Sequence, residues 1–115
     1  MNFLVSMRHA VQGLVTIWKR EPNFRTEILC GVLVCGASYY LALSRFDWII
    51  VLLLIFAVLL CEIVNSVMEA IIDLLSPRYH TLAKQIKDMM AAATLLMAIA
   101  SVLVGLWIFI PYLMK

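Results

Sequence analysis

The sequence predicts an all-α membrane protein, in which an amphipathic surface helix precedes three helices that cross the bilayer. Hydrophobic residues make up 65% of the 115 residues, far above the roughly 45–50% apolar share of soluble domains. The mean hydropathy is +1.03, and three separate stretches are apolar enough to span. A chain of this length has room for one compact unit, so we expect a single integral-membrane domain over residues 1–115.

The segment about 3–20 is predicted to be a helix that lies in the membrane interface. One half of its helical wheel is apolar, whereas the other half carries polar and basic side chains, including Arg8 and His9. This pattern is typical of an interfacial helix with its basic face toward water and headgroups. Packing against a neighbouring subunit would give the same pattern. Proline disfavours helix in the residue before it, so we expect the helix to end at Glu21-Pro22.

The three predicted spans cover residues of about 28–44, 48–75 and 89–114. The first span is short, near the lower limit of about 17 residues for a membrane helix. The second begins with an uninterrupted apolar run and continues through a series of acidic residues. The third carries alanines, a serine and a glycine, the small residues that let membrane helices approach closely. Between the second and third spans, Pro77 marks a turn.

Positive charges predict the orientation of the chain in the membrane. Four basic residues precede the first span and three lie between the second and third, whereas the opposite side carries Arg45 and Lys115. The positive-inside rule therefore places the N-terminus and the 76–87 loop in the cytoplasm. This orientation puts the acidic residues of the second span in its cytoplasmic half, where soluble metabolites can reach them.

One face of the second span is acidic. At about 100° per residue on a helix, its polar residues fall within roughly 100° of arc and the remaining face is apolar; the polar set is Glu62, Asn65, Ser66, Glu69 and Asp73. Each ionisable group in hydrocarbon costs about 2.5–3.5 kcal/mol on insertion scales, so several on one face indicate a functional site. The alternative is a set of helix-end carboxylates that pair with lysines at a bundle interface.

Several function classes are disfavoured by the composition. A formal net charge of +2 is too small to indicate nucleic-acid binding. The cysteines Cys30, Cys35 and Cys61 have neither metal-ligand nor disulfide spacing. The four glycines are scattered and form no phosphate-binding loop. A bound nucleotide would therefore be held by side chains and metal.

The polar groups near the predicted cytoplasmic interface suit a nucleotide and its acceptor. Carboxylates bind Mg²⁺, basic side chains neutralise phosphate oxygens, and a further carboxylate can accept a hydroxyl proton. Glu62 lies about 10 Å deeper along the helix than Glu69, at roughly 1.5 Å per residue. We therefore expect the metal and triphosphate near Glu69, and removal of a proton from a lipid hydroxyl at Glu62.

Four motifs in this order carry a family resemblance: Gly13-Leu14, Glu21-Pro-Asn-Phe24-Arg25-Thr-Glu27, the Glu62–Asp73 segment, and Lys87-Asp88 before an alanine run. The E-x-x-N-[ST]-x-x-E-x-x-x-D pattern with a downstream K-D is highly specific. The chain resembles the prokaryotic diacylglycerol kinase family, which includes the undecaprenol kinases of Gram-positive bacteria. The resemblance covers nearly the whole chain.

The resemblance implies a homotrimeric helical bundle with active sites shared between subunits, in the bacterial cytoplasmic (inner) membrane. It implies transfer of the γ-phosphoryl of Mg-ATP to a membrane lipid alcohol. Glu62 looks like the catalytic base, with Asn65 beside it at the lipid hydroxyl. Glu21 and Glu69 look like the ligands of Mg²⁺ and the ATP phosphates. Further nucleotide contacts carried over are Arg78, Tyr79, His80, Lys87, Asp88 and, through a less direct match, His9; Glu27 and Asp73 are supporting residues.

The resemblance leaves the lipid open between diacylglycerol, which would give phosphatidate, and undecaprenol, which would give undecaprenyl phosphate. The loop after Pro77 and the Gly105-to-Pro111 ending are closer to the undecaprenol branch, and Glu27 to the diacylglycerol branch. Two functions from other classes are alternatives. A small proton-coupled exporter could also use an intramembrane glutamate, and a non-catalytic assembly subunit could also have three spans.

Overall fold

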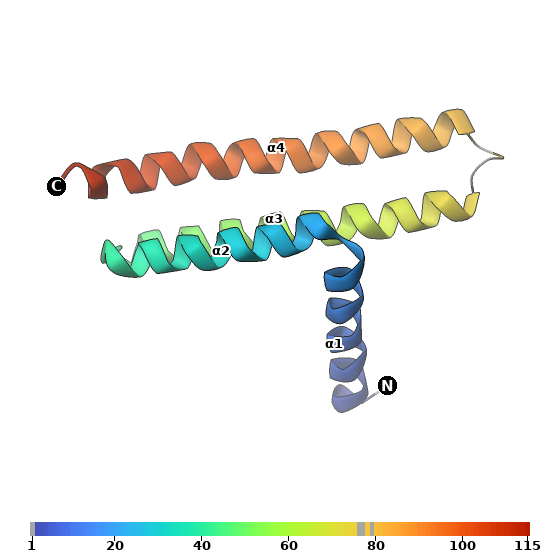
Figure 1. Cartoon of the computed structure of the whole chain (residues 1–115), viewed down its shortest axis with the longest axis horizontal. Helices are drawn as coiled ribbons and strands as arrows, with labels where there is room; N and C mark the ends of the chain where they lie inside the picture. The colour runs from blue at the N-terminus through green and yellow to red at the C-terminus, as the bar shows by residue number, and fades with distance from the viewer. Residues whose placement is uncertain (1, 76–77, 79) are drawn as a thin grey trace.

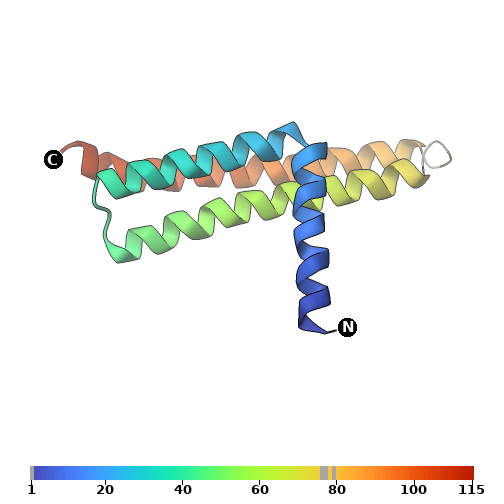
Figure 2. The same cartoon turned by 60° about the horizontal axis from the view of Figure 1, so that its bottom comes forward.

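The computed structural model describes residues 2–75, 78 and 80–115, and these form four α-helices. In chain order they are α1 (Phe3–Arg20), α2 (Pro22–Tyr40), α3 (Arg45–Leu75) and α4 (His80–Leu113). The helices α2, α3 and α4 run side by side along the long axis, and α1 projects away from them to one side (Figure 1). The same arrangement is visible in the turned view (Figure 2). The chain is thus an all-α protein, as the sequence predicted.

Helix α1 begins and ends through local interactions. The Asn2 side chain accepts a hydrogen bond from the backbone N–H of Val5 at 2.9 Å, which caps the first turn. At the other end, Glu21 leaves the helical conformation (φ −115°, ψ 106°), and Pro22 opens α2 at its first position. Proline is compatible with that position because its missing N–H would have no helical partner there. The chain therefore changes direction at Glu21-Pro22.

Helix α2 differs from the predicted 28–44 range at both ends. It starts six residues earlier, at Pro22, because the helix resumes directly after the break. It ends at Tyr40, and Leu41 is its C-cap. Ala42 then adopts a left-handed conformation with φ 54°, which a helix cannot continue through. Residues 41–44 therefore form the turn into α3.

Two of the described helices are long and apolar enough to cross a membrane, α3 with 31 residues and α4 with 34. Their outward faces expose large apolar side chains such as Leu53, Phe56 and Trp107. Such a surface would be unfavourable in water and is expected in contact with lipid tails. These features identify an all-α membrane protein. The predicted turn residues Ser76 and Pro77 lie outside the described residues.

Helix α3 is the central element, since it packs against both α2 and α4. At the α2–α3 contact, a Cβ atom at Gly31 would come within 3.1 Å of Ile55 Cγ2, so glycine permits the close approach. At the end of the bundle far from α1, Tyr112 of α4 donates a hydrogen bond to Asp47 Oδ2 at 2.6 Å. Its hydroxyl also accepts one from the backbone N–H of Ser44 at 3.0 Å. These bonds connect the end of α4 to the α2–α3 turn and to the first turn of α3.

Candidate active site

The polar face of α3 is progressively buried along the helix. Asp73, nearest the α3–α4 connection, is exposed, and Asn65 and Glu69 are half-buried. Ser66 and Glu62 are only 4% and 3% exposed. The helical spacing of these residues places all five side chains on one side of the helix. The protein therefore holds a carboxylate, Glu62, away from solvent at the inner end of this face.

Glu21 joins this face from the junction of α1 and α2. The Ser66 hydroxyl donates a hydrogen bond to Glu21 Oε1 at 2.9 Å, and Arg20 Nε lies 3.7 Å from the same oxygen. The helix break at Pro22 accounts for this position, because Glu21 sits in the extended residue between two helices. The predicted metal ligand Glu21 is thus beside the α3 polar face, although 41 residues separate it from Glu62 in the sequence.

Four carboxylates are close enough to interact electrostatically. Glu62 is repelled by Glu21 and Glu69, and Glu27 of α2 is repelled by Glu62. The Asn65 amide donates to Glu69 Oε1 at 3.4 Å, a long hydrogen bond within the same helix. Gathering like charges in a poorly solvated place is unfavourable. The cluster is therefore a site that cations would stabilise.

Lys87 of α4 faces the outer end of this polar face. Its Nζ lies 3.1 Å from Asp73 Oδ1, across the connection between α3 and α4. Asp88 instead pairs with Lys84, one turn earlier on α4, at 2.9 Å. The hydrogen bond that the Lys84 ammonium donates to the Asp88 carboxylate holds the pKa of Lys84 above its usual value. Asp73 therefore fits the alternative prediction, in which carboxylates at the end of the helix pair with lysines.

The other predicted nucleotide contacts are at the margins of the site or outside the described residues. His80 begins α4 and is exposed, and Arg78 is exposed and has an interaction partner. His9 is exposed on α1, about 18 Å of helix from Glu21 at roughly 1.5 Å per residue. Tyr79 lies outside the described residues. The structure thus brings Lys87 toward the acidic face and leaves His9 on the projecting helix.

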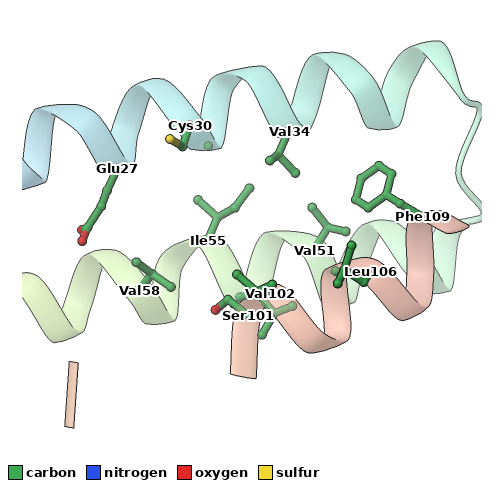
Figure 3. Close-up of a pocket in the computed structure, with 13 residues that line it drawn as sticks. Glu27, Cys30, Val34, Val51, Ile55, Val58, Ser101, Val102, Leu106 and Phe109 are labelled. Carbon is green, nitrogen blue, oxygen red and sulfur yellow. The ribbon is translucent and has the colours of Figure 1, made fainter. Parts of the chain in front are cut away.

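An apolar cleft of about 490 Å³ lies between α2, α3 and α4 (Figure 3). Glu27 lies at one end, where its carboxylate projects toward α3, and Phe109 lies at the other end. Among the described residues, Glu27 Oε2 and Ser101 Oγ, which both line the cleft, are buried without a hydrogen-bond partner. Sequence reasoning did not identify Ser101 as polar lining, because its hydroxyl interrupts an apolar helix without a periodic pattern. The cleft therefore combines a hydrocarbon-like wall with two polar atoms.

The donor set fits a magnesium ion that is bound together with phosphate. Carboxylate oxygens are hard ligands, and Mg²⁺ is usually held by one or two of them, with substrate phosphates and water completing the shell. Within the described ranges, no group of three or more His, Cys, Asp or Glu side chains is placed to hold a metal by itself. Glu21 and Glu69 offer carboxylates to such a shared site.

Ser66 is the functional candidate to which sequence reasoning gave no role. Its position on the polar face was evident from the spacing, but its partner, Glu21, comes from the junction of α1 and α2. The sequence did offer one signal for Ser66. Its hydroxyl lies between Glu62 and Glu69 on a face whose other polar groups are carboxylates and an amide. These features together define an integral membrane protein with a partly buried acidic site on one long helix.

Comparison with known proteins identifies the family. The family model for prokaryotic diacylglycerol kinase matches residues 8–109. The chain is 36% identical over 114 residues to the undecaprenol kinase of Bacillus subtilis, covering 97% of this chain and 91% of that protein. It is 37% identical over 115 residues to a diacylglycerol kinase of Synechocystis, covering 99% and 66% respectively. With the diacylglycerol kinase of Escherichia coli K12 it shares 30% identity over 92 residues, covering 80% and 75%.

The chain therefore belongs to the prokaryotic diacylglycerol kinase family. Membership confirms the family resemblance and the enzyme class predicted from the motifs, a lipid kinase. It does not favour the exporter or the assembly subunit. The acidic face of α3 and the Glu21 junction both lie within the matched residues 8–109.

Proposed function

We propose that this lipid kinase transfers the γ-phosphoryl group of Mg-ATP to the hydroxyl of a membrane lipid alcohol at the acidic face of α3. The observation that carries the proposal is the burial of Glu62, at 3% exposure, beside carboxylates from two other segments. A buried carboxylate next to a cation-attracting cluster has the properties needed to accept a hydroxyl proton during phosphoryl transfer.

Each residue of the site has a chemical role in this proposal. Glu62 accepts the proton of the lipid hydroxyl while that oxygen bonds to the γ-phosphorus, and the bond to the β–γ bridging oxygen breaks to release ADP. Asn65 orients the hydroxyl. Glu21 and Glu69 would hold Mg²⁺, which neutralises charge on the phosphate oxygens when it is bound. Further nucleotide contacts would come from Arg78, Tyr79, His80, Lys87 and Asp88, with Glu27 and Asp73 in support.

The apolar cleft supports a lipid acceptor. It ends at Glu27, whose carboxylate interacts with Glu62, so a hydrocarbon chain in the cleft would place its polar end near the proposed base. Ligand sites of this kind are mostly apolar with few polar groups. The relatives named above include kinases of both diacylglycerol and undecaprenol, and both alcohols carry long hydrocarbon chains. We keep both as candidate substrates.

The proposed membrane arrangement adds α2 as a third span. It is 19 residues long and lies alongside α3, while Arg25 and Glu27 in its first turns make its composition less apolar. The N-terminus and the α3–α4 connection face the cytoplasm in this arrangement, because the basic residues gather there. A homotrimer with shared active sites is part of the proposal, and chemical cross-linking in membranes tests it.

The test of function is a radiolabel transfer assay. Purified protein in lipid nanodiscs receives labelled ATP and Mg²⁺ with diacylglycerol or undecaprenol in parallel. Glu62→Gln is expected to lower the turnover number about 10²- to 10⁴-fold, the usual contribution of a general base, while Mg-ATP binding persists. Glu69→Gln is expected to weaken Mg-ATP binding as well. Undiminished transfer in Glu62→Gln would refute the assignment of the base, and wild-type protein inactive on both alcohols would refute the substrate class.

A further inference from the structure

Ser66 uses its hydroxyl differently from other hydroxyl side chains in the helices. Four of these donate to the backbone carbonyl four residues earlier in their own helix, at 2.8–3.2 Å: Thr16, Thr26, Ser38 and Thr94. This local bond is the usual one for a helical serine or threonine. Ser66 donates instead to Glu21 Oε1 at 2.9 Å, 45 residues away in sequence. Its hydroxyl therefore fixes another side chain.

Glu21 is available for this bond because its carboxylate does not cap α2. Short side chains such as Ser, Thr, Asp and Asn at the N-cap usually accept a hydrogen bond from a backbone N–H of the first turn, and glutamate is not among them. Glu21 occupies the N-cap of α2 without such a side-chain bond. Oε1 is instead held by Ser66, with Arg20 Nε at 3.7 Å. Within the described residues both contacts go to Oε1, which leaves the second oxygen, Oε2, open to a further partner.

We propose that Ser66 is a positioning residue, whose hydroxyl fixes the Glu21 carboxylate so that its second oxygen faces the metal of Mg-ATP. This inference rests on the proposed function. Carboxylates that bind metals are commonly oriented by hydrogen bonds from neighbouring side chains, and loss of such a neighbour weakens metal binding. Ser66 is buried, so water has little access to replace its hydroxyl.

The test measures metal binding directly. Manganese substitutes for magnesium, and free Mn²⁺ is followed by electron paramagnetic resonance as protein in nanodiscs is titrated in the presence of a non-hydrolysable ATP analogue. Ser66→Ala is expected to weaken Mn²⁺ binding about 10- to 100-fold. Ser66→Thr is expected to restore most of the affinity, because it keeps a hydroxyl and its methyl can enter the cleft of about 650 Å³ beside Ser66.

Ser38→Ala is the matched control. Ser38 is also a buried helical serine, but its hydroxyl bonds to the Val34 carbonyl within α2 at 2.8 Å, so its loss should leave Mn²⁺ binding unchanged. Thermal unfolding without metal establishes that the variants fold. If Ser66→Ala does not fold, Ser66→Cys takes its place, since it keeps the volume and has a much weaker donor, and the same loss is expected.

The outcomes separate this inference from the function on which it rests. Mn²⁺ affinity in Ser66→Ala equal to wild type overturns the inference, and so does an equal loss in Ser38→Ala or no restoration by Ser66→Thr. The Mn²⁺ affinity of Glu21→Gln is measured in parallel, because this variant loses the proposed metal ligand itself. If wild type phosphorylates lipid and Glu21→Gln loses Mn²⁺ while Ser66→Ala keeps it, the positioning role alone fails. If wild type transfers no label to either lipid alcohol, the proposed function fails.

Discussion

Substitutions of Lys87 and Asp73 test whether Lys87 serves only an ion pair or also binds ATP. Lys87 Nζ lies 3.1 Å from Asp73 Oδ1, and the side chains are 46% and 61% exposed, respectively. An ion pair this exposed contributes about 0.2–1 kcal/mol to folding. Asp73→Asn and Lys87→Met should therefore each lower the free energy of unfolding by less than about 1 kcal/mol.

Activity should respond to these two substitutions unequally. If Lys87 donates to a phosphate oxygen in the nucleotide complex, its removal loses a hydrogen bond between charged groups, worth about 1.5–3 kcal/mol. At about 1.4 kcal/mol per factor of ten, Lys87→Met should raise the KM for ATP about 10- to 100-fold. Asp73→Asn removes only the partner that holds the lysine, so its KM should rise less.

The assay is lipid phosphorylation at varied ATP concentration, with thermal unfolding of the same preparations. Lys115→Met is the control for loss of one positive charge, because Lys115 follows the opposite end of α4, two residues after Leu113. The reasoning is refuted if Asp73→Asn raises the KM as much as Lys87→Met. It is also refuted if Lys87→Met leaves the KM unchanged, since the ammonium would then serve only the exposed ion pair.

Two further predictions concern packing that supports the site. Gly31→Leu should lower stability by about 1–3 kcal/mol through overpacking, because its Cβ would meet Ile55 Cγ2 at 3.1 Å; chemical denaturation in detergent measures this. Gly36→Ala is its control, since no atom of another described segment lies within 4 Å of the added Cβ, and an equal loss there would contradict the explanation. Tyr112→Phe should cost about 1–3 kcal/mol, because Asp47 loses its hydroxyl donor; an unchanged thermal midpoint would contradict this.

The sequence predicted the parts of the site that depend on helical period. The spacing from Glu62 to Asp73 places those side chains on one face whatever the helix packs against, and the structure has that face. The break at Glu21-Pro22 was also predictable, because the effect of proline is local. The end of α2 was not, since no glycine or proline marks the left-handed residue Ala42. The helix therefore ends at Tyr40, four residues before the predicted limit.

Contacts between distant segments were beyond sequence reasoning. The bond from Ser66 to Glu21 joins residues 45 apart, and that from Tyr112 to Asp47 joins residues 65 apart. The acidic surroundings of Ser66 in the sequence mark its face of the helix, but they do not identify its partner. The role proposed for Ser66 rests on its observed partner, Glu21. A pattern on one helix cannot specify which segment will face it.

The break between α1 and α2 explains how a water-soluble donor and a membrane acceptor could meet at one place. Were residues 3–40 one continuous helix, Glu21 would be one side chain on its surface. The extended conformation at Glu21 instead places its carboxylate against Ser66 on α3. Ser66 is one helical turn, about 6 Å, from Glu62 toward the exposed Asp73. A metal held at Glu21 would therefore lie on the outer side of the buried base, where phosphates can arrive from water while a lipid hydroxyl approaches from the apolar cleft.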